Sequence, residues 1–558
     1  RHLSPAESFI RLSPLQVSGA SLCCSVQSRQ VQLSSPHTTT TTWTNFFTGI
    51  KSPYIGADVY DKCRTRSRKS YKGGVVAKKS NVIRLIENNE ALGDEGYILR
   101  AERDSITLIA QTEKGIFYAE QTLEQLMEGA VIQCMEITDK PRFGYRSFML
   151  DSARHMQSID EIKKLIDAAA LLKMNTMHWH LSDDQGFRIE SKKFPLLNEK
   201  GSWRNSDDFG SMHTGKRYGG YYTQDEIKEI VAYCKEKFID VVPEIDLPGH
   251  STAIISSYPE LSCRKLQIPV ETKQGIFDDV LCIGDENTLQ FVYGLLDEII
   301  PLFPYEKFHI GGDEVKYRRW ENCPKCTAKK QELGFDNFSQ LQWHFTKQVI
   351  DHLGKHGKKA IVWNESLAGG KLTDEATVQM WLDPKKHSVR HANRGGKVIT
   401  TDFYHYYCDY PYHMTPLRKT YNFNPLLKGI APVMQKNVLG VEAPLWTEYV
   451  CDFDKLCYMF FPRIAAVAEV GWSKKENLDC AEFEKRFRKI TPILENIGIH
   501  PAKPEEWNPT PLQRLSGTVK FFSDKISVDL SKIIDAESFK TARNKKITSE
   551  YITLLRLN

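Results

Sequence analysis

The chain has 558 residues, of which 41% are hydrophobic and 26% are charged, which is ordinary for a globular protein with an ample core. Lys and Arg number 75 against 70 Asp and Glu, and the net charge of +5 is too small at this length to indicate a nucleic-acid partner. No apolar run reaches about 18 residues, so we expect no integral membrane segment.

Residues 1–80 carry no readable secondary-structure pattern. They are rich in Ser and Thr, include the run Thr38–Thr42 and end in a basic stretch, so disorder and a divergent edge of a domain fit equally well. The chain starts at Arg1, and its first 30 residues lack the basic-then-apolar pattern of a signal peptide. We therefore leave residues 1–80 unassigned and expect an N-terminus that is processed or incomplete.

A small α/β domain is predicted over residues 81–140. Gly96–Arg100 and Ser105–Ala110 alternate in the manner of paired strands, and Gly115–Met127 has the apolar spacing of a helix.

Over residues 141–500, apolar runs alternate with amphipathic stretches eight times. The predicted strands are Arg146–Asp151, Asn175–Leu181, Val241–Asp246, Phe308–Gly312, Ala360–Trp363, Val378–Leu382, Val398–Asp402 and Val438–Trp446. The predicted helices between them include Ile159–Leu172, Asp225–Lys237, Asn287–Leu302 and Phe338–Leu353. This order predicts an α/β protein whose main domain is a (β/α)₈ TIM barrel. Residues 501–558 stay unassigned.

Acidic, basic and aromatic residues gather where the predicted strands end, which is one rim of such a barrel. They are Asp151, Arg154, Asp183, Asp184, His250, Asp313, Glu314, Trp363, Trp381, Tyr407, Asp409, Trp446 and Glu448. Tryptophan faces stack on the C–H surfaces of a pyranose, while carboxylates and arginine bind its hydroxyls. A single Trp is more often core filler, but three at strand ends favour a sugar pocket.

The adjacent acids Asp313 and Glu314 indicate a particular kind of sugar chemistry. Neighbouring residues of a strand point to opposite faces, so the pair does not easily straddle a glycosidic bond as acid and nucleophile about 5–5.5 Å apart. At a strand end, one carboxyl can reach the leaving group and the other a substituent of the same sugar. That suits cleavage in which a 2-acetamido oxygen attacks C1, although a solvated acidic turn is the plainer alternative. Gly311 and Gly312 let the backbone turn and the sugar approach closely.

The thirteen cysteines are too sparse for a disulfide scaffold. Cys263 and Cys282 flank a loop and could be bridged in an oxidising compartment. Cys323 and Cys326 have the spacing of a zinc-binding pair, but no second pair of matching spacing follows closely, so a surface turn is the favoured interpretation.

From about residue 95 to residue 475 the chain resembles the family-20 glycoside hydrolases, the β-N-acetylhexosaminidases. The matching segments are Pro141–Phe143, Asp151–His155, His178–Gly186, Gly219–Thr223, Pro243–His250, His309–Glu314, Trp446–Glu448 and Phe461–Arg463. Gly115–Tyr118 also looks like the small domain that precedes the barrel in that family. Residues 1–80 do not show the family's opening strands, and nothing recognisable follows residue 500.

The resemblance implies a role for each matching residue. Glu314 would be the general acid/base, and Asp313 would orient and stabilise the acetamido group. Tyr407 would hydrogen-bond the attacking carbonyl oxygen, and Asp184 and His250 would form a relay behind Glu314. The substrate-binding residues would be Arg154, Asp409 and Glu448 around the sugar hydroxyls, and Trp363, Trp381 and Trp446 around the ring and acetamide.

The resulting expectation is an exo-acting retaining enzyme that removes terminal N-acetylglucosamine or N-acetylgalactosamine through an oxazolinium intermediate. We expect a carbohydrate substrate, no cofactor, no metal and an extracytoplasmic location (secreted, periplasmic or lysosomal); nothing indicates an oligomeric state.

Two other functions and one other reading of the rim stay open. A metal-dependent amidohydrolase would use His178 and His180, but it needs further His ligands and an Asp at the eighth strand, where Trp446 and Glu448 stand. A non-catalytic carbohydrate-binding barrel would usually lose the acid, whereas both acids are present. Arg154 and the rim carboxylates could instead form a structural ion network.

Overall fold

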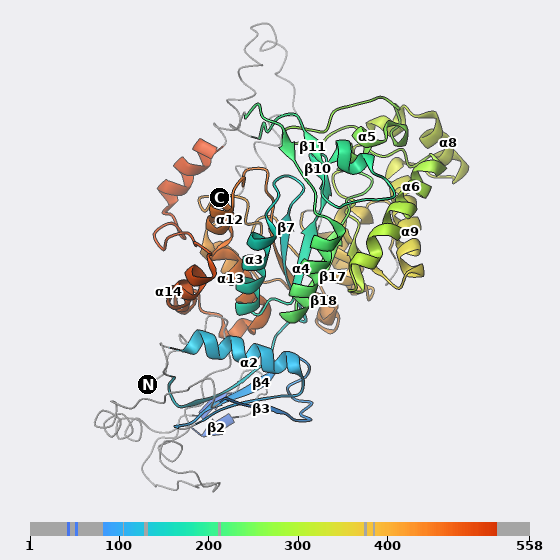
Figure 1. The fold of residues 1–558 in the computed structure, drawn as a ribbon. Coiled ribbons are helices and arrows are strands. Elements are labelled where there is room, and N and C mark those ends of the chain that lie inside the picture. Colours follow the sequence, from blue (N-terminus) through green and yellow to red (C-terminus); the bar gives the residue numbers. More distant parts are fainter. Residues whose placement is uncertain are drawn as a thin grey trace.

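The computed structural model describes residues 42–44, 51–53, 82–103, 105–127, 132–209, 214–372, 376–382 and 385–521. Its centre is a closed barrel of eight parallel strands (Figure 1). They are β7 (Tyr145–Asp151), β8 (Thr176–His180), β13 (Asp240–Glu244), β14 (Lys307–His309), β15 (Lys359–Trp363), β16 (Thr377–Met380), β17 (Lys397–Thr400) and β18 (Val438–Leu445). Pairing of β18 with β7 closes the ring, so the predicted TIM barrel and its eight strands are confirmed.

Helices surround the barrel strands (Figure 1). They are α3 (Ile159–Leu171), α4 (Gln224–Glu236), α5 (Thr252–Ser257), α6 (Glu286–Ile299), α7 (Arg318–Glu321), α8 (Pro324–Glu332), α9 (Phe338–Lys355), α10 (Lys386–Asn393), α11 (Leu417–Tyr421), α12 (Phe453–Phe460), α13 (Arg463–Trp472) and α14 (Cys480–Ile497). The N-terminus of α3 is fixed by a capping box, in which Ser158 and Glu161 each accept a backbone N–H. The four helices predicted from apolar spacing correspond to α3, α4, α6 and α9.

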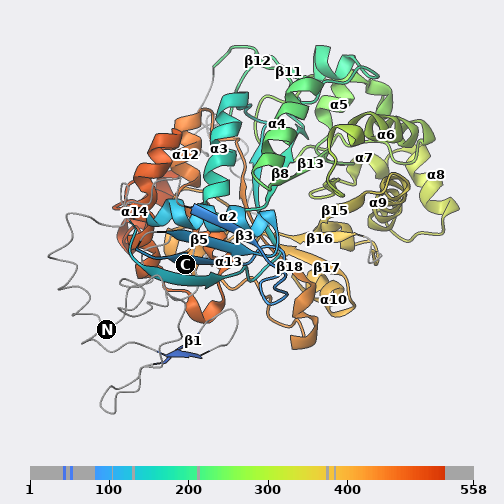
Figure 2. The ribbon, with the colours of Figure 1, turned by 60° about the horizontal axis from the view of Figure 1, so that its bottom comes forward.

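A four-stranded sheet and one helix precede the barrel. The sheet has the order β3-β5-β4-β6, formed by β3 (Val82–Ile86), β4 (Tyr97–Ala101), β5 (Ile106–Ala110) and β6 (Met135–Asp139). Strands β4 and β5 pair antiparallel, as their alternation predicts. Helix α2 (Glu113–Leu126) lies between this sheet and the barrel (Figures 1 and 2).

Short elements cover the end of the barrel opposite the small sheet (Figure 1). The hairpin strands are β9 (Ser182–Asp183), β10 (Gly186–Phe187), β11 (Trp203–Arg204) and β12 (Tyr218–Gly219). Because β9 and α5 directly follow β8 and β13, this end is the carboxyl-terminal rim.

Little of the two unassigned end segments is described. From residues 1–80 the structure describes only β1 (Thr42–Thr44) and β2 (Lys51–Pro53), which pair antiparallel. The interpretation of this segment as disordered or as a divergent edge of a domain lies mostly outside the described residues. Of the unassigned segment 501–558, residues 501–521 are described and residues 511–521 are helical, whereas 522–558 lie outside the described residues. The domain bounds 81–140 and 141–500 stay a prediction. Among the described helices, none has the length and apolarity needed to cross a membrane.

Candidate active site

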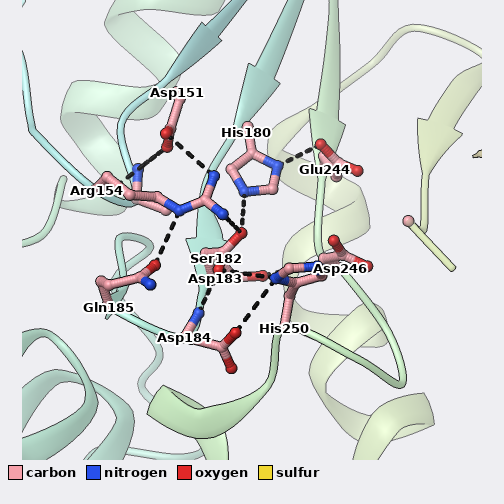
Figure 3. A network of polar contacts seen from close by, with 12 residues as sticks. Asp151, Arg154, His180, Ser182, Asp183, Asp184, Gln185, Glu244, Asp246 and His250 are labelled. Carbon is pink, nitrogen blue, oxygen red and sulfur yellow. Dashed lines mark hydrogen bonds and ion pairs between the residues drawn. The ribbon is translucent and has the colours of Figure 1, made fainter. Parts of the chain in front are cut away.

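Arg154 is the buried cation of the rim. It follows Asp151, the last residue of β7, whose carboxylate accepts the backbone N–H of Arg154 at 3.1 Å. Its Nη2 lies 2.7 Å from Asp183 Oδ2, its Nη1 lies 3.2 Å from Asp151 Oδ2, and its Nε donates to Gln185 at 2.9 Å (Figure 3). The guanidinium is therefore fixed by a rigid set of acceptors.

Asp409 and Glu448, the acidic residues predicted to act with Arg154, are not those nearest to it in the structure. Glu448 lies 3.9 Å from Nη2, and the guanidinium carbon lies 5.0 Å from the centre of the Trp446 ring. Asp409 follows β17 together with Tyr407, and its negative charge acts on the Tyr407 hydroxyl. The nearest acidic partners are Asp151 and Asp183, which stood at predicted strand ends but were given no role.

His250 stands between two pairs of carboxylates. Its Nδ1 lies 3.2 Å from Asp183 Oδ1 and 3.3 Å from Asp184 Oδ2 (Figure 3). Its Nε2 lies 3.6 Å from Glu314 Oε2 and 3.8 Å from Asp313 Oδ2. Burial lowers the pKa of His250, but Asp183 and the other acids outweigh burial and hold it well above its usual value. The residues predicted to form a relay are thus brought together, with Asp183 as an added member.

The turn after β14 presents the two adjacent acids. Glu314 has a φ of 51°, in the left-handed region, as do Gly311 at 65° and Gly312 at 101°. A Cβ atom at Gly311 would stand 1.7 Å from Asp246 Oδ1, and that same oxygen accepts the N–H of Gly312 at 3.1 Å. Glycine is therefore required at 311, and the strand ends at His309 because the chain bends there.

Asp313 and Glu314 stand in different surroundings. Asp313 is buried, and burial together with the neighbouring Asp246 carboxylate raises its pKa well above its usual value. The Glu314 side chain is 27% exposed, so it alone of the pair faces solvent. Glu365, which follows β15, is a third acid here: burial and the charge of Glu314 raise its pKa to about 7.

Four aromatic side chains form a box beside these acids. Trp363 ends β15, Trp381 follows β16, Tyr407 follows β17 and Trp446 follows β18. The Trp381 and Tyr407 rings are stacked 5.9 Å apart, and Trp446 lies 6.1 Å from Trp363 and 6.4 Å from Tyr407. Trp381 Nε1 donates to Glu365 at 3.2 Å, which holds the indole in place.

The barrel interior below the box is a polar network centred on Glu244. His178 Nε2 lies 3.0 Å and His309 Nδ1 lies 2.8 Å from Glu244, and Trp363 Nε1 donates to it at 2.9 Å. His180 joins Glu244 to Asp183, 2.9 Å from its Nε2 (Figure 3). These imidazoles therefore support the rim residues from below.

Asp183, Asp246 and Glu365 received no assigned role in this site from the sequence. Each stands at or just after a barrel strand, so its position on the rim could be predicted. Their partners could not, because Arg154, Gly312 and Trp381 come from other strands and meet them only when the barrel closes.

An eight-stranded parallel barrel whose rim unites paired acids, a buried arginine and an aromatic box has the architecture of a glycoside hydrolase. The model of the glycosyl hydrolase family 20 catalytic domain matches residues 143–475, and that of domain 2 of the same family matches residues 57–140. The chain belongs to glycosyl hydrolase family 20. The domain 2 match begins ahead of the boundary predicted at residue 81.

Relatives and solved structures agree with this assignment. A β-hexosaminidase of Porphyromonas gingivalis is 38% identical over 74% of this chain and 56% of its own length. A β-hexosaminidase of Vibrio furnissii is 35% identical over 70% of this chain and 67% of its own length. A GH20 exo β-N-acetylglucosaminidase of Vibrio harveyi, solved in complex with N-acetylglucosamine, has a TM-score of 0.69 at 33% identity, covering 76% of this chain and 70% of that one. The chain thus spans little more than half the length of the first relative.

Proposed function

We propose that this chain is an exo-acting retaining β-N-acetylhexosaminidase that hydrolyses terminal non-reducing N-acetylglucosamine and N-acetylgalactosamine. The observation that carries the proposal is the pair Asp313 and Glu314, one buried and one partly exposed, beside a closed aromatic box. Adjacent residues of one turn do not easily flank a glycosidic bond as acid and nucleophile. The proposed nucleophile is therefore the substrate's own acetamide, which forms an oxazolinium intermediate.

The two acids have different catalytic roles. Glu314 donates a proton to the leaving oxygen and later accepts one from water, with His250 and behind it Asp183 and Asp184 adjusting its charge. Asp313 binds the acetamide N–H. A negative charge on Asp313 is opposed by burial and by Asp246, so the cationic oxazolinium favours that charge more than the neutral substrate does.

Tyr407 completes the acetamide site. Burial raises the pKa of its hydroxyl well above the usual value, so the group remains a hydrogen-bond donor at any physiological pH. It donates to the acetamide carbonyl oxygen and holds it below C1, while Trp363, Trp381 and Trp446 enclose the methyl group and the ring. Arg154, Asp409 and Glu448 bind the remaining hydroxyls.

The test is the requirement for an acetamide. Loss of a well-oriented internal nucleophile forfeits a large effective molarity, so a chromogenic β-glucoside is expected to react roughly a thousandfold more slowly than the matching β-N-acetylglucosaminide. The corresponding thiazoline should inhibit as a mimic of the cyclic intermediate. Equal rates on the two glycosides would contradict the acetamide-assisted mechanism. Binding of the sugar without hydrolysis would favour the non-catalytic carbohydrate-binding barrel. Full activity in a strong chelator would dismiss the amidohydrolase.

Exo action follows from the closed rim. Arg154 is buried among Asp151, Asp183 and Glu448, and we propose that this group binds O3, O4 and O6 of the terminal sugar and thereby excludes a further sugar at O4. We expect a chitin hexamer to shorten one residue at a time from its non-reducing end. Chromatography of the early products measures this. Dimers and tetramers as first products would show that the pocket is open.

An extracytoplasmic location is a separate part of the proposal, because glycans with terminal N-acetylhexosamine are concentrated on secreted and surface molecules. Fractionation of the source cells with a fluorogenic substrate tests it, and activity confined to the cytoplasm would contradict it.

A further inference from the structure

Four cysteines from two separate segments converge next to the catalytic turn. Cys263 and Cys282 flank the loop that follows α5, while Cys323 is the N-cap residue of α8 and Cys326 lies in its first turn. All four sulfur atoms lie within 4.8 Å of one another. The surface turn favoured from the sequence is wrong, because Cys326 is 0% and Cys323 is 4% exposed.

The spacing of the sulfur atoms is that of a tetrahedral metal site. Sγ of Cys263 lies 3.8 Å from that of Cys326, and Sγ of Cys282 lies 3.7 Å from those of Cys323 and Cys326. Ligands about 2.3 Å from a central Zn²⁺ stand about 3.8 Å apart, since that is the edge of the tetrahedron. A disulfide would need about 2.05 Å, and all four cysteines are unpaired, including Cys263 and Cys282.

The backbone around the sulfur atoms is closely fitted. A Cβ atom at Gly284 would stand 2.5 Å from the Cα and N atoms of Cys326, so only glycine lets the two segments approach this closely. Leu281, beside Cys282, accepts the indole N–H of Trp320 at 2.8 Å. These contacts hold the backbone beside Cys282 and Cys326 in place.

The cluster is open to a cation from one side. Thiolate is the form of cysteine that binds a metal, so binding of Zn²⁺ releases protons from the thiols. Three of the sulfur atoms are fully or nearly buried and Cys263 is partly exposed, which leaves one side for the ion to enter.

We propose that Cys263, Cys282, Cys323 and Cys326 bind one structural Zn²⁺. Four protein ligands leave no open position, so the ion takes no part in the hydrolysis. The site lies next to the catalytic residues in the chain: the N–H of Leu281 donates to Pro248, two residues before His250, and α8 follows the turn that carries Glu314. The ion therefore ties together the two segments that position the acid and its histidine.

The first test is the metal content of the full chain, purified without added metal or chelator and measured by mass spectrometry of the elements. We expect about one zinc per chain and almost none in Cys323→Ser or Cys282→Ser. The matched control is Cys234→Ser, which removes a buried cysteine of α4 outside the cluster and should keep its zinc. Wild-type protein without zinc, or with one iron per chain, would overturn the proposal, as would full zinc in the cluster variants.

A second test does not depend on whether the variants fold. Alkylation of denatured wild-type protein without reductant should modify all four cysteines, whereas resistance to alkylation would show two disulfides and overturn the proposal. Wild-type protein produced with Co²⁺ in place of zinc should show the intense visible bands of a tetrahedral thiolate site, and their absence in cobalt-containing protein would contradict the ligand set. Neither readout uses enzymatic activity, so failure here and failure of the proposed function are distinguishable.

Discussion

Two neighbouring carboxyl groups, Asp313 and Glu314, carry the chemistry proposed for this protein. They differ because the chain turns between them: Asp313 faces inward to Asp246, while Glu314, with its positive φ, turns outward to His250 and solvent. A single residue step thus produces one buried group that responds to a developing cation and one accessible group that exchanges protons.

Separate substitutions should distinguish the two acids. Glu314→Gln loses proton donation, which is worth roughly 10²–10⁴-fold, so substrates with poor leaving groups should suffer far more than activated aryl glycosides. Asp313→Asn should slow all substrates alike, because alignment of the acetamide precedes departure of any leaving group. The measurement is kcat/KM against the pKa of the leaving group. Equal slopes for both variants would show that the roles are wrongly assigned.

The limits of prediction at this scale are illustrated by Arg154 and the cysteines. Arg154 could be placed on the rim because it follows a strand, but its tightest partner, Asp183, comes from the next strand and is reached only in the closed barrel. Cys323 and Cys326 showed the spacing of a metal-binding pair. Their partners were missed because Cys263 and Cys282 come earlier and are separated by a long loop with no characteristic spacing.

At the scale of elements, the order of strands and helices was predictable because buried strands and amphipathic helices have different periods. The residues at which the strands end were less predictable. The fourth strand was predicted to reach Gly312, but β14 ends at His309. The apolar run continues through Ile310, yet the positive φ of Gly311 breaks the extended backbone, and that conformation leaves no trace in hydrophobic patterning.

That turn provides a prediction with a matched control. Gly311 and Gly357 have φ values of 65° and 71°, but a Cβ atom at Gly311 would collide with Asp246, whereas Gly357 has open space around it. Gly357→Ala should cost about 1 kcal/mol of unfolding free energy through backbone strain and leave kcat/KM unchanged. Gly311→Ala should be less stable than that and should lose about 10²-fold or more in kcat/KM, because the acids are displaced. Equal activity in the two variants would mean that Asp246 can move aside.

At the scale of the whole molecule, the small sheet is joined to the barrel by a buried ion pair. Glu95, in the turn before β4, lies with its Oε2 2.7 Å from Arg146 of β7 and its Oε1 2.7 Å from Lys114 of α2. Asn175, just before β8, donates to the same carboxylate at 3.0 Å. The junction is at the end of the barrel opposite the active site, so it bears on stability rather than on catalysis.

Acid titration should reveal this junction. Burial opposes the charge of Glu95, but Arg146 and Lys114 outweigh it and lower its pKa to about 2. A carboxyl whose folded-state pKa is depressed contributes stability above its unfolded pKa and loses it as pH falls through the folded value. Glu95→Gln should therefore lower the unfolding free energy by roughly 3 kcal/mol at pH 7, and the difference from wild type should shrink as pH falls from about 4.5 towards 2. Thermal melts across this range measure it, with the exposed Glu124→Gln as control. A difference in Tm that is independent of pH would mean that packing, and not charge, holds the two parts together.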